Sequence, residues 1–182
     1  MIIVEGPDGA GKTTLIKNIL DAYPDLEVAP RVVSKETNDL TDLQQWVDHN
    51  LAEGFQYKLF DRHRLISEFI YGPTLRKEQR PGFTSGVWVH GSLRRFYLLK
   101  PVIIYCLPPL EVVRQNVTGD PDNVQVAEHI EQIYTAYLER ASLDVINAGA
   151  LIYDFTRDGV EQNPLGILHH YINRANERAF LS

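Results

Sequence analysis

The first fourteen residues place a glycine-rich turn between an apolar stretch and an amphipathic one. Residues 2–4 are a β-branched run typical of a buried strand, and residues 14–20 carry apolar side chains at helical spacing. Glycines in such a turn allow backbone N–H groups to face phosphate oxygens, and the start of the helix adds a partial positive charge. Strand, turn and helix together predict a phosphate-binding loop, and therefore a nucleotide-binding protein.

The turn fits the pattern G-x-x-x-x-G-K-[ST], in which the lysine and the hydroxyl residue have defined roles. Lys12 is expected to contact the β- and γ-phosphates of ATP, and the Thr13 hydroxyl is expected to bind Mg²⁺. A chance glycine turn before a helix is disfavoured, because the motif and both flanks agree. The predicted nucleotide-binding residues of the turn are Gly6, Pro7, Asp8, Gly9, Ala10, Gly11, Lys12, Thr13 and Thr14.

Length and composition favour one cytoplasmic domain. The 182 residues suit a single domain, residues 1–182, with a sizeable core. The sequence holds no run of eighteen apolar residues, which predicts that nothing spans a membrane, and the turn comes too early to follow a signal peptide. The single cysteine, Cys106, lies in an apolar run and is expected to be a core residue in a reducing compartment.

Strand-like and helix-like segments alternate along the chain. Strands are expected at 2–4, within 26–33, and at 57–60, 102–107 and 151–155. Helices are expected at 14–20, 40–51, 65–71 (ending at the Gly-Pro of 72–73), 87–99, 108–117 and 124–147, and after 163–164, with a loop at 74–84. This alternation predicts an α/β fold of the P-loop NTPase type, with a parallel sheet of about five strands and helices on both faces. Ligands are then expected at the carboxyl ends of the strands.

A second chemical element, Asp61-Arg62, follows the predicted strand at 57–60. In a parallel sheet both side chains would emerge at the edge where the phosphate loop lies. A carboxylate there can hold Mg²⁺ or accept the proton of an attacking hydroxyl, and a guanidinium can bind a phosphate through two hydrogen bonds. A surface ion pair is the alternative interpretation, and the position one strand after the loop favours function.

The charge distribution is uneven. Residues 58–100 contain nine Lys or Arg and three acidic residues, a net charge of +6 in a chain whose total is −6, so the rest of the chain carries −12. A basic middle in an acidic protein suggests that this segment meets an anion, and a surface of unrelated solvated charges is the alternative.

Several groups of residues together carry a family resemblance. They are the turn from Gly6 to Thr14; Asp61, Arg62 and His63 with Ser67, Tyr71 and Gly72; and Pro101 to Tyr105 with Pro108 to Glu111 and Arg114. This combination resembles the thymidylate kinase family, over nearly the whole chain and most specifically in the first two groups. The resemblance implies transfer of the γ-phosphoryl group of ATP, with Mg²⁺, to a thymidine-like acceptor. It also implies that Asp8 lies near the acceptor, that Asp61 and Arg62 serve the acceptor phosphate and the metal, and that Thr156 and Arg157 border adenine.

Two positions depart from the family pattern. The loop has Gly9 where an arginine can stand, and residues 118–123, at the place of the family's lid, form a short acidic segment without Lys or Arg. An arginine that stabilises phosphoryl transfer is worth roughly 10³- to 10⁵-fold in rate in GTPases. Arg114 is the nearest candidate replacement, and an ordinary arginine on a helix surface is an equally good interpretation. The prediction is a single kinase domain with a reduced lid near 118–123.

The reduced lid and the basic segment favour one branch of this resemblance, the viral 5-hydroxymethyluracil (5-hmdU) DNA kinases. These enzymes phosphorylate the hydroxymethyl group of the base within DNA, which would place the protein in the host cytoplasm. Aromatic residues that could stack on an unpaired base lie among the basic residues, although core packing is their more common role: Phe69, Tyr71, Phe83, Trp88, Phe96 and Tyr97. The alternatives are a kinase of dTMP or another free deoxynucleoside monophosphate, and a switch or binding module that hydrolyses ATP without a small acceptor. The oligomeric state is open, with a homodimer as one option.

Overall fold

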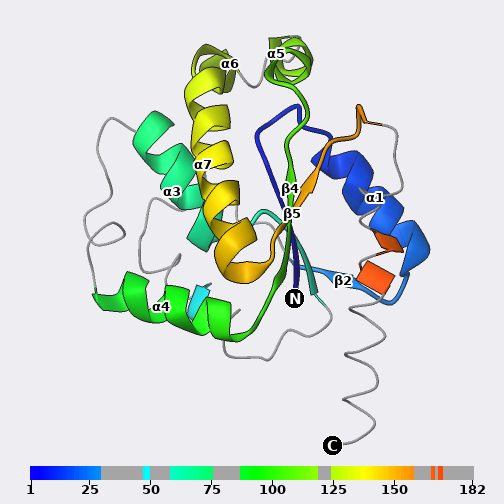
Figure 1. Cartoon of the computed structure of the whole chain (residues 1–182), viewed down its shortest axis with the longest axis vertical. Helices are drawn as coiled ribbons and strands as arrows, with labels where there is room; N and C mark the ends of the chain where they lie inside the picture. The colour runs from blue at the N-terminus through cyan, green and yellow to red at the C-terminus, as the bar shows by residue number, and fades with distance from the viewer. Residues whose placement is uncertain are drawn as a thin grey trace, which may run out of the picture.

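Five parallel strands form the centre of the protein (Figure 1). The computed structural model describes residues 1–29, 47–49, 58–75, 87–118, 124–157, 165–166 and 168–169. Its strands are β1 (Ile2–Glu5), β2 (Glu27–Val28), β3 (Lys58–Asp61), β4 (Val102–Cys106) and β5 (Leu151–Tyr153), in the order β2-β3-β1-β4-β5. All neighbouring pairs are parallel, so the carboxyl ends of the strands meet at one edge of the sheet.

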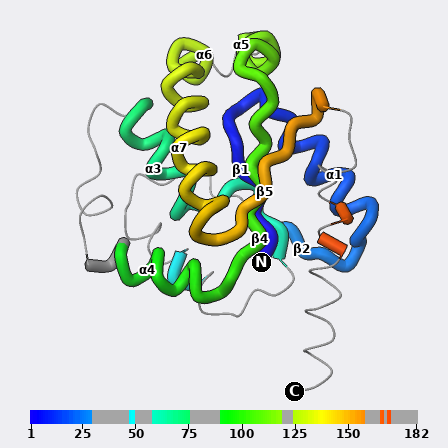
Figure 2. The backbone as a smooth tube through the Cα atoms, in the orientation of Figure 1, coloured from blue at the N-terminus to red at the C-terminus, as the bar shows by residue number. Residues whose placement is uncertain are grey.

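Helices cover both faces of this sheet. In Figure 1, α3, α4 and α7 lie on one side and α1 lies on the other, and the backbone trace in Figure 2 shows the same arrangement. The helices are α1 (Lys12–Ala22), α3 (Arg64–Leu75), α4 (Val87–Leu98), α5 (Leu110–Thr118), α6 (Val124–Glu128) and α7 (Ile130–Ala148). The predicted α/β architecture, with about five parallel strands and helices on both faces, is therefore confirmed.

Strands β1 and β4 are buried because both of their faces are covered. Ile3 and Val4 of β1 and Ile103 and Ile104 of β4 are each no more than 1% exposed. Strands buried on both faces read as continuous β-branched runs, which is why the sequence pattern located β1 and β4. Cys106 at the end of β4 is also fully buried, and burial raises the pKa of its thiol to about 12, so it is the core residue that was predicted.

Helix α3 continues past the predicted stop at Gly72-Pro73 and ends at Leu75. Proline removes one helical N–H donor and usually ends a helix. Here the last turn is supported by the Thr74 hydroxyl, which donates to the Ile70 carbonyl at 2.9 Å, and by packing of α3 against α7. Tertiary packing thus overrides the local signal, and Thr74 and Leu75 lie in the helix instead of in the predicted loop.

The single long helix predicted over 124–147 is divided into α6 and α7 at His129. His129 has φ −114° and ψ 12°, and its N–H donates to the Val126 carbonyl, three residues back, at 3.1 Å. Such a tightened last turn ends α6 without glycine or proline, so the sequence carried no breaker signal. Gly149 ends α7 in a left-handed conformation, as expected of a glycine after a helix.

Other predicted boundaries shift by a few residues. Strand β5 ends at Tyr153, because Asp154 accepts the Thr156 N–H and turns the chain. Of the helix predicted over 40–51, the described residues 47–49 are helical, and of the helix predicted after 163–164, residues 165–166 and 168–169 are helical. Most of the loop predicted at 74–84 and the lid segment 119–123 lie outside the described residues. Among the helices in the described ranges, none combines the length and apolar character that crossing a membrane requires.

Candidate active site

The phosphate loop connects β1 to α1, and its glycines fit closely against neighbouring elements. Gly9 has φ +75°, and a Cβ atom there would lie 2.8 Å from a methyl carbon of Val117 and 2.9 Å from the Val113 carbonyl oxygen, both on α5. A side chain cannot be placed at this position without displacing α5. The absence of an arginine in the loop is therefore built into the packing of this fold.

Lys12 is the first residue of α1, and its ammonium group points back into the loop. The Nζ atom donates to the Pro7 carbonyl at 2.6 Å, and the residue is 8% exposed. Burial, reinforced by the positive charge of Arg62, lowers the pKa of Lys12 to about 8, while Asp8 and Asp61 oppose this shift. The buried ammonium group thus interacts electrostatically with the carboxylates of Asp8 and Asp61.

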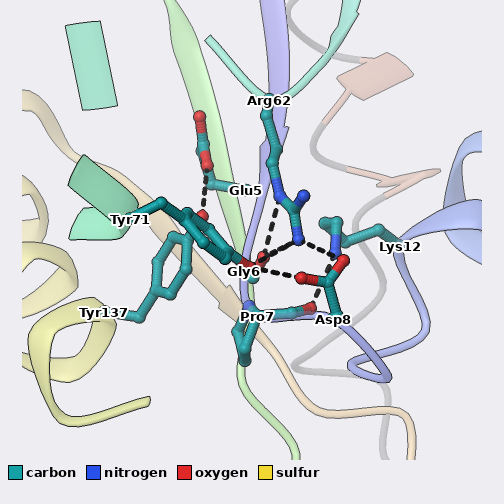
Figure 3. A network of polar contacts seen from close by, with 8 residues as sticks. All are labelled: Glu5, Gly6, Pro7, Asp8, Lys12, Arg62, Tyr71 and Tyr137. Atoms are coloured by element: carbon teal, nitrogen blue, oxygen red, sulfur yellow. Dashed lines mark hydrogen bonds and ion pairs between the residues drawn. The ribbon is translucent and has the colours of Figure 1, made fainter. Parts of the chain in front are cut away.

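Arg62, Asp8 and Tyr71 form one hydrogen-bonded network at the carboxyl ends of β1 and β3 (Figure 3). The Arg62 Nη2 atom donates to Asp8 Oδ1 and to the Tyr71 hydroxyl, each at 2.7 Å, and the Tyr71 hydroxyl donates to Asp8 Oδ2 at 2.8 Å. The guanidinium also lies over the Tyr71 ring, 4.7 Å from its centroid. Both Asp8 oxygens are therefore engaged, and the three residues hold each other in place.

The charges in this network reinforce one another. Burial alone would raise the pKa of Asp8, but Arg62 and Lys12 outweigh it and the pKa is lowered. Burial alone would lower the pKa of Arg62, but Tyr71, Tyr137 and Asp8 outweigh it and the pKa is raised. Asp8 and Arg62 are consequently both ionised at neutral pH.

A left-handed turn directs Arg62 toward the loop. Arg62 has φ +65°, which is uncommon for a residue other than glycine. Its N–H donates to the Val4 carbonyl at 2.9 Å, and the next N–H, that of His63, donates to Glu5 Oε1 at 2.6 Å. Two consecutive backbone N–H groups of this turn, those of Arg62 and His63, are therefore bonded to residues of β1.

Glu5 is a site residue that sequence reasoning missed. It is fully buried, its second oxygen accepts a hydrogen bond from the Tyr137 hydroxyl at 3.1 Å, and burial raises the pKa of its carboxyl to about 7. A charged residue at the end of an apolar strand, immediately before the phosphate loop, was a usable signal. Tyr137 lies in the middle of α7, and no local pattern distinguishes it from a core residue.

Asp61 is the last residue of β3 and pairs in register with Val4 of β1. This register brings Asp61 to the sheet edge where the phosphate loop begins, as predicted from its position after the strand. Thr13 is exposed in the first turn of α1. In the part of the chain that the structure describes, no three His, Cys, Asp or Glu side chains form a metal-binding cluster.

Helix α5 packs on the phosphate loop, but its arginine is engaged elsewhere. Asn116 donates its side-chain N–H to the Gly9 carbonyl at 2.8 Å. Arg114 instead forms ion pairs with Glu111 at 2.7 Å and with Glu131 of α7. The structure thus brings Asn116, which the sequence did not single out, to the loop, and directs Arg114 to two carboxylates.

The turn after β5 lies against the end of the phosphate loop. A Cβ atom on Gly11 would lie 2.9 Å from the Phe155 ring. Asp154 holds this turn through the Thr156 hydroxyl at 2.6 Å and through Arg157, whose Nε atom lies 3.1 Å from Asp154 Oδ2. Arg157 is 72% exposed, so the structure brings the turn to the loop through Phe155 while the Arg157 side chain stays largely in solvent.

The basic segment is partly neutralised where it is described. Lys58 pairs with Glu27 at 3.5 Å, Arg64 with Glu68 at 3.5 Å, and Arg95 with Asp48 at 3.1 Å. Arg94 is exposed on α4, and residues 76–80 lie outside the described ranges.

Two of the aromatic residues in this segment have packing roles. Phe96 is fully buried in the core, and the Tyr97 hydroxyl donates to Asp144 at 2.7 Å. His63 is fully buried between the rings of Phe60 and Phe96, and burial lowers its pKa to about 3, so it is neutral.

Comparison with known proteins identifies the fold. No protein-family model matches the chain, and no curated protein matches it either. Among solved structures, the chain is similar to the YorR protein of Bacillus subtilis in complex with phosphorylated GDP, with a TM-score of 0.66 and 16% identity over 99% of this chain and 94% of that one. It is also similar to deoxyadenosine kinase from M. mycoides. With dCTP bound the TM-score is 0.55 at 18% identity, covering 96% of this chain and 100% of that one. With dATP bound the TM-score is 0.54 at 17% identity, covering 94% of this chain and 98% of that one. The strand order, the phosphate loop and these likenesses together show that the chain has the α/β P-loop NTPase fold.

Proposed function

We propose that this protein is an ATP-dependent phosphotransferase that phosphorylates a hydroxyl group on a thymidine-like acceptor. The observation that carries this proposal is the network of Arg62, Asp8 and Tyr71 beside Lys12. A carboxylate, a guanidinium and a phenol held in one network beside the phosphate loop can position an acceptor hydroxyl for attack on a bound γ-phosphate. One of the similar solved proteins is a deoxyadenosine kinase, which supports the same class of reaction.

In the proposed reaction the acceptor hydroxyl oxygen attacks the γ-phosphorus of ATP. A new P–O bond forms, the bond from the γ-phosphorus to the β–γ bridging oxygen breaks, and ADP leaves with that electron pair. Lys12 and Arg62 supply the positive charge that stabilises the transferring group. The hydroxyl proton passes to a carboxylate, and Asp61, which is partly exposed at the end of β3, is the candidate, since Glu5 is fully buried with both of its oxygens bonded.

The described residues fit a Mg²⁺ ion that is held mainly by the nucleotide. Mg²⁺ commonly keeps several waters and binds through one or two protein oxygens together with substrate phosphates. The exposed Thr13 hydroxyl and the Asp61 carboxylate supply such oxygens, without a cluster of protein ligands in the described ranges. Bound there, the ion would neutralise charge on the β- and γ-phosphates.

The charge balance of the site favours an uncharged hydroxyl as acceptor. Around the phosphate loop, the cations found within the described ranges are Lys12 and Arg62, and they face the carboxylates of Asp8, Asp61 and Glu5. Arg62 already donates to Asp8 and Tyr71, so an acceptor phosphate would have to displace one of them. A hydroxymethyl group on a base requires no such exchange. We therefore assign 5-hydroxymethyluracil in DNA as the preferred acceptor.

A free deoxynucleoside monophosphate, such as dTMP, is the second candidate. The buried guanidinium of Arg62 favours it, because such a group could exchange Asp8 for a phosphate through two hydrogen bonds. Deoxyadenosine kinase has also been solved with dCMP as a product, which supports deoxynucleotide chemistry on this fold.

Transfer of the labelled γ-phosphate of ATP distinguishes these acceptors. The reactions contain DNA with 5-hydroxymethyluracil, the same DNA with thymine, thymidine, dTMP, or no acceptor, each with wild type and with the Lys12→Ala variant. We expect label in the modified DNA, none in plain DNA, and at least a 100-fold loss in Lys12→Ala, because Lys12 contacts the charge that shifts in the transition state. Labelled dTMP without labelled DNA would establish the second candidate. Phosphate release that no acceptor stimulates would establish an ATP-hydrolysing switch.

Salt dependence gives an independent test of a polymeric acceptor. Each phosphate neutralised on DNA adds about −0.9 (duplex) or −0.7 (single strand) to the slope of log K against log salt. Three contacts would weaken binding about 20- to 40-fold between roughly 50 and 200 mM salt. Candidates for these contacts are Arg76, Lys77, Arg80, Arg94 and Arg95. A shallow salt dependence for modified DNA would argue against binding of the polymer backbone.

A further inference from the structure

Helix α5 touches the phosphate loop through one hydrogen bond whose donor lies 107 residues from its acceptor. The Asn116 side chain donates to the Gly9 carbonyl at 2.8 Å, while Val113 and Val117 of the same helix are buried beneath the loop. The helix itself is anchored mainly by the buried Val113 and Val117, and Arg114 also pairs with Glu131 on α7. Asn116 therefore approaches the loop from a fixed support.

The Gly9 carbonyl belongs to the same peptide unit as the Ala10 N–H. In a trans peptide these two groups point in opposite directions. Because Asn116 holds the carbonyl toward α5, the Ala10 N–H is turned to the inner side of the loop. There it donates to the Pro7 carbonyl at 3.4 Å, a bond that a bound phosphate would replace, and the same carbonyl also accepts from the Lys12 ammonium at 2.6 Å.

Gly9 has little conformational restraint of its own. Its φ of +75° is available to glycine without a steric penalty, and so are other backbone conformations. Without an external partner, the peptide between Gly9 and Ala10 could rotate and turn its carbonyl inward, where it would repel phosphate oxygens. The hydrogen bond from Asn116 of α5 therefore orients a peptide of the loop that Gly9 itself leaves free to rotate.

We propose that Asn116 is a positioning residue of the phosphate site, which fixes the peptide between Gly9 and Ala10 so that the Ala10 N–H donates to a bound phosphate. The proposal rests on the proposed binding of ATP at this loop, and it adds a determinant outside the G-x-x-x-x-G-K-[ST] motif. Asn116 does not touch the nucleotide in this account; it acts through the loop backbone.

Two substitutions distinguish a positioning role of Asn116 from a packing role. Asn116→Ala removes the donor, and Asn116→Asp keeps nearly the same volume but places a carboxylate oxygen against the Gly9 carbonyl, so the hydrogen bond is lost. Gln115→Ala, at an exposed neighbouring position on α5, is the matched control. Thermal unfolding of each variant shows whether the fold is retained, which we expect because Asn116 is exposed.

The measured quantities are the dissociation constants of ATP with Mg²⁺, of inorganic triphosphate with Mg²⁺, and of adenosine, by calorimetry on the full chain. We expect Asn116→Ala to weaken ATP and triphosphate binding about 3- to 10-fold, as for loss of one neutral hydrogen bond, and Asn116→Asp to weaken both further. Adenosine binding and Gln115→Ala should match wild type.

The outcomes that contradict the proposal are distinct. Equal ATP affinity in wild type, Asn116→Ala and Asn116→Asp overturns the role of Asn116 while leaving the proposed function intact. Equal weakening of adenosine and triphosphate, or retention of affinity in Asn116→Asp, assigns Asn116 to packing and also overturns it. A wild-type protein that binds neither ATP nor triphosphate overturns the proposed function together with this inference.

Discussion

The Nη2 atom of Arg62 lies 2.7 Å from Oδ1 of Asp8, although 54 positions separate the two residues in the chain. One comes from the turn after β3 and the other from the phosphate loop after β1. Because β1 and β3 are parallel neighbours, their carboxyl ends present both side chains at one edge of the sheet. The ion pair therefore couples the proposed acceptor side of the site to the loop that would hold the phosphates.

Substitution of Arg62 by lysine tests this coupling. Lysine keeps the positive charge but cannot bond Gly6, Asp8 and Tyr71 together from one planar group, as Arg62 does. We expect Arg62→Lys to lower kcat/KM for phosphoryl transfer by about 100-fold, comparable to the loss of one preorganised donor in an active site. Steady-state kinetics with labelled ATP measure this, and an unaltered kcat/KM would remove Arg62 from the reaction.

Tyr71→Phe tests a single hydroxyl group of the same network. It deletes the hydroxyl that bonds Asp8 and Arg62 but keeps the ring under the guanidinium, so the expected loss in kcat/KM is about 10-fold. Tyr134→Phe is the matched control, because its hydroxyl also makes one hydrogen bond, to the Pro108 carbonyl at 2.8 Å, away from this network. Similar losses in both variants would indicate a general effect of removing a hydroxyl.

Asp61→Asn tests the assignment of Asp61 to the metal. The substitution keeps the shape at the end of β3 and removes the charge, so kcat should fall by about 100-fold or more while the Kd of ATP changes little. The Mg²⁺ concentration needed for half-maximal rate should rise. Asp21→Asn, at an exposed position on α1, is the control. A loss of ATP affinity with unchanged turnover of bound substrate would contradict the assignment.

Gly9→Ala tests the packing between the loop and α5. Alanine at φ +75° is strained, and its Cβ atom would lie within 3.0 Å of Val117, Val113 and Asn116. We expect at least a 10-fold loss of ATP affinity, because the loop must move away from α5. Gly91→Ala is the control: it lies in helix α4, and nothing lies within 4 Å of its added Cβ atom.

The two glycine variants should change the stability of the fold in opposite directions. Gly91→Ala should raise the free energy of unfolding by roughly 0.5–1 kcal/mol, as expected for an exposed helix interior. Gly9→Ala should lower the melting temperature. Normal ATP affinity in a folded Gly9→Ala protein would show that the loop tolerates a side chain beside α5.

The sequence predicted the architecture because its strongest signals are local. The β-branched runs of β1 and β4 and the motif ending at Lys12 and Thr13 depend only on neighbouring residues, and the position of Asp61-Arg62 after a strand placed both at the correct sheet edge. The extension of α3 beyond Gly72-Pro73 and the break at His129 depend on packing and backbone geometry, which periodicity does not report.

The composition of the site was predicted less fully, for a related reason. Lys12, Asp8 and Arg62 stand in recognisable motifs, whereas Asn116 and Tyr137 reach the site from helices whose patterns look like ordinary surface and core. Arg114 was predicted to be in the site because of its charge, but in the structure it pairs with Glu111 and Glu131. The pairing with Glu131 depends on how α5 packs on α7. Their roles follow from contacts across the fold, so single-sequence reasoning had no means of finding them.

Glu5→Gln tests the buried carboxyl through the pH dependence of stability. Burial raises the pKa of Glu5 from 4.5 to about 7 in the folded state, so the folded protein binds this proton more tightly than the unfolded chain does. The contribution of Glu5 to stability therefore decreases as pH rises from about 4.5 to about 7, and is constant outside that window. At about one kcal/mol or more per unit of pKa, the full decrease is on the order of 3 kcal/mol.

Glutamine resembles the protonated carboxyl, since its oxygen can accept from the His63 N–H while its amide donates to the Tyr137 hydroxyl. The melting temperature of Glu5→Gln should equal that of wild type near pH 4.5 and exceed it increasingly up to about pH 7, by several degrees in all. Phosphoryl transfer should change little, because the fully buried Glu5 carboxyl does not reach the acceptor. Thermal unfolding across this pH range, with kcat measured near pH 7.5, checks both effects. A difference in melting temperature that does not vary with pH would mean that Glu5 ionises with an ordinary pKa, and a large loss of kcat in a folded variant would show that Glu5 takes part in the reaction.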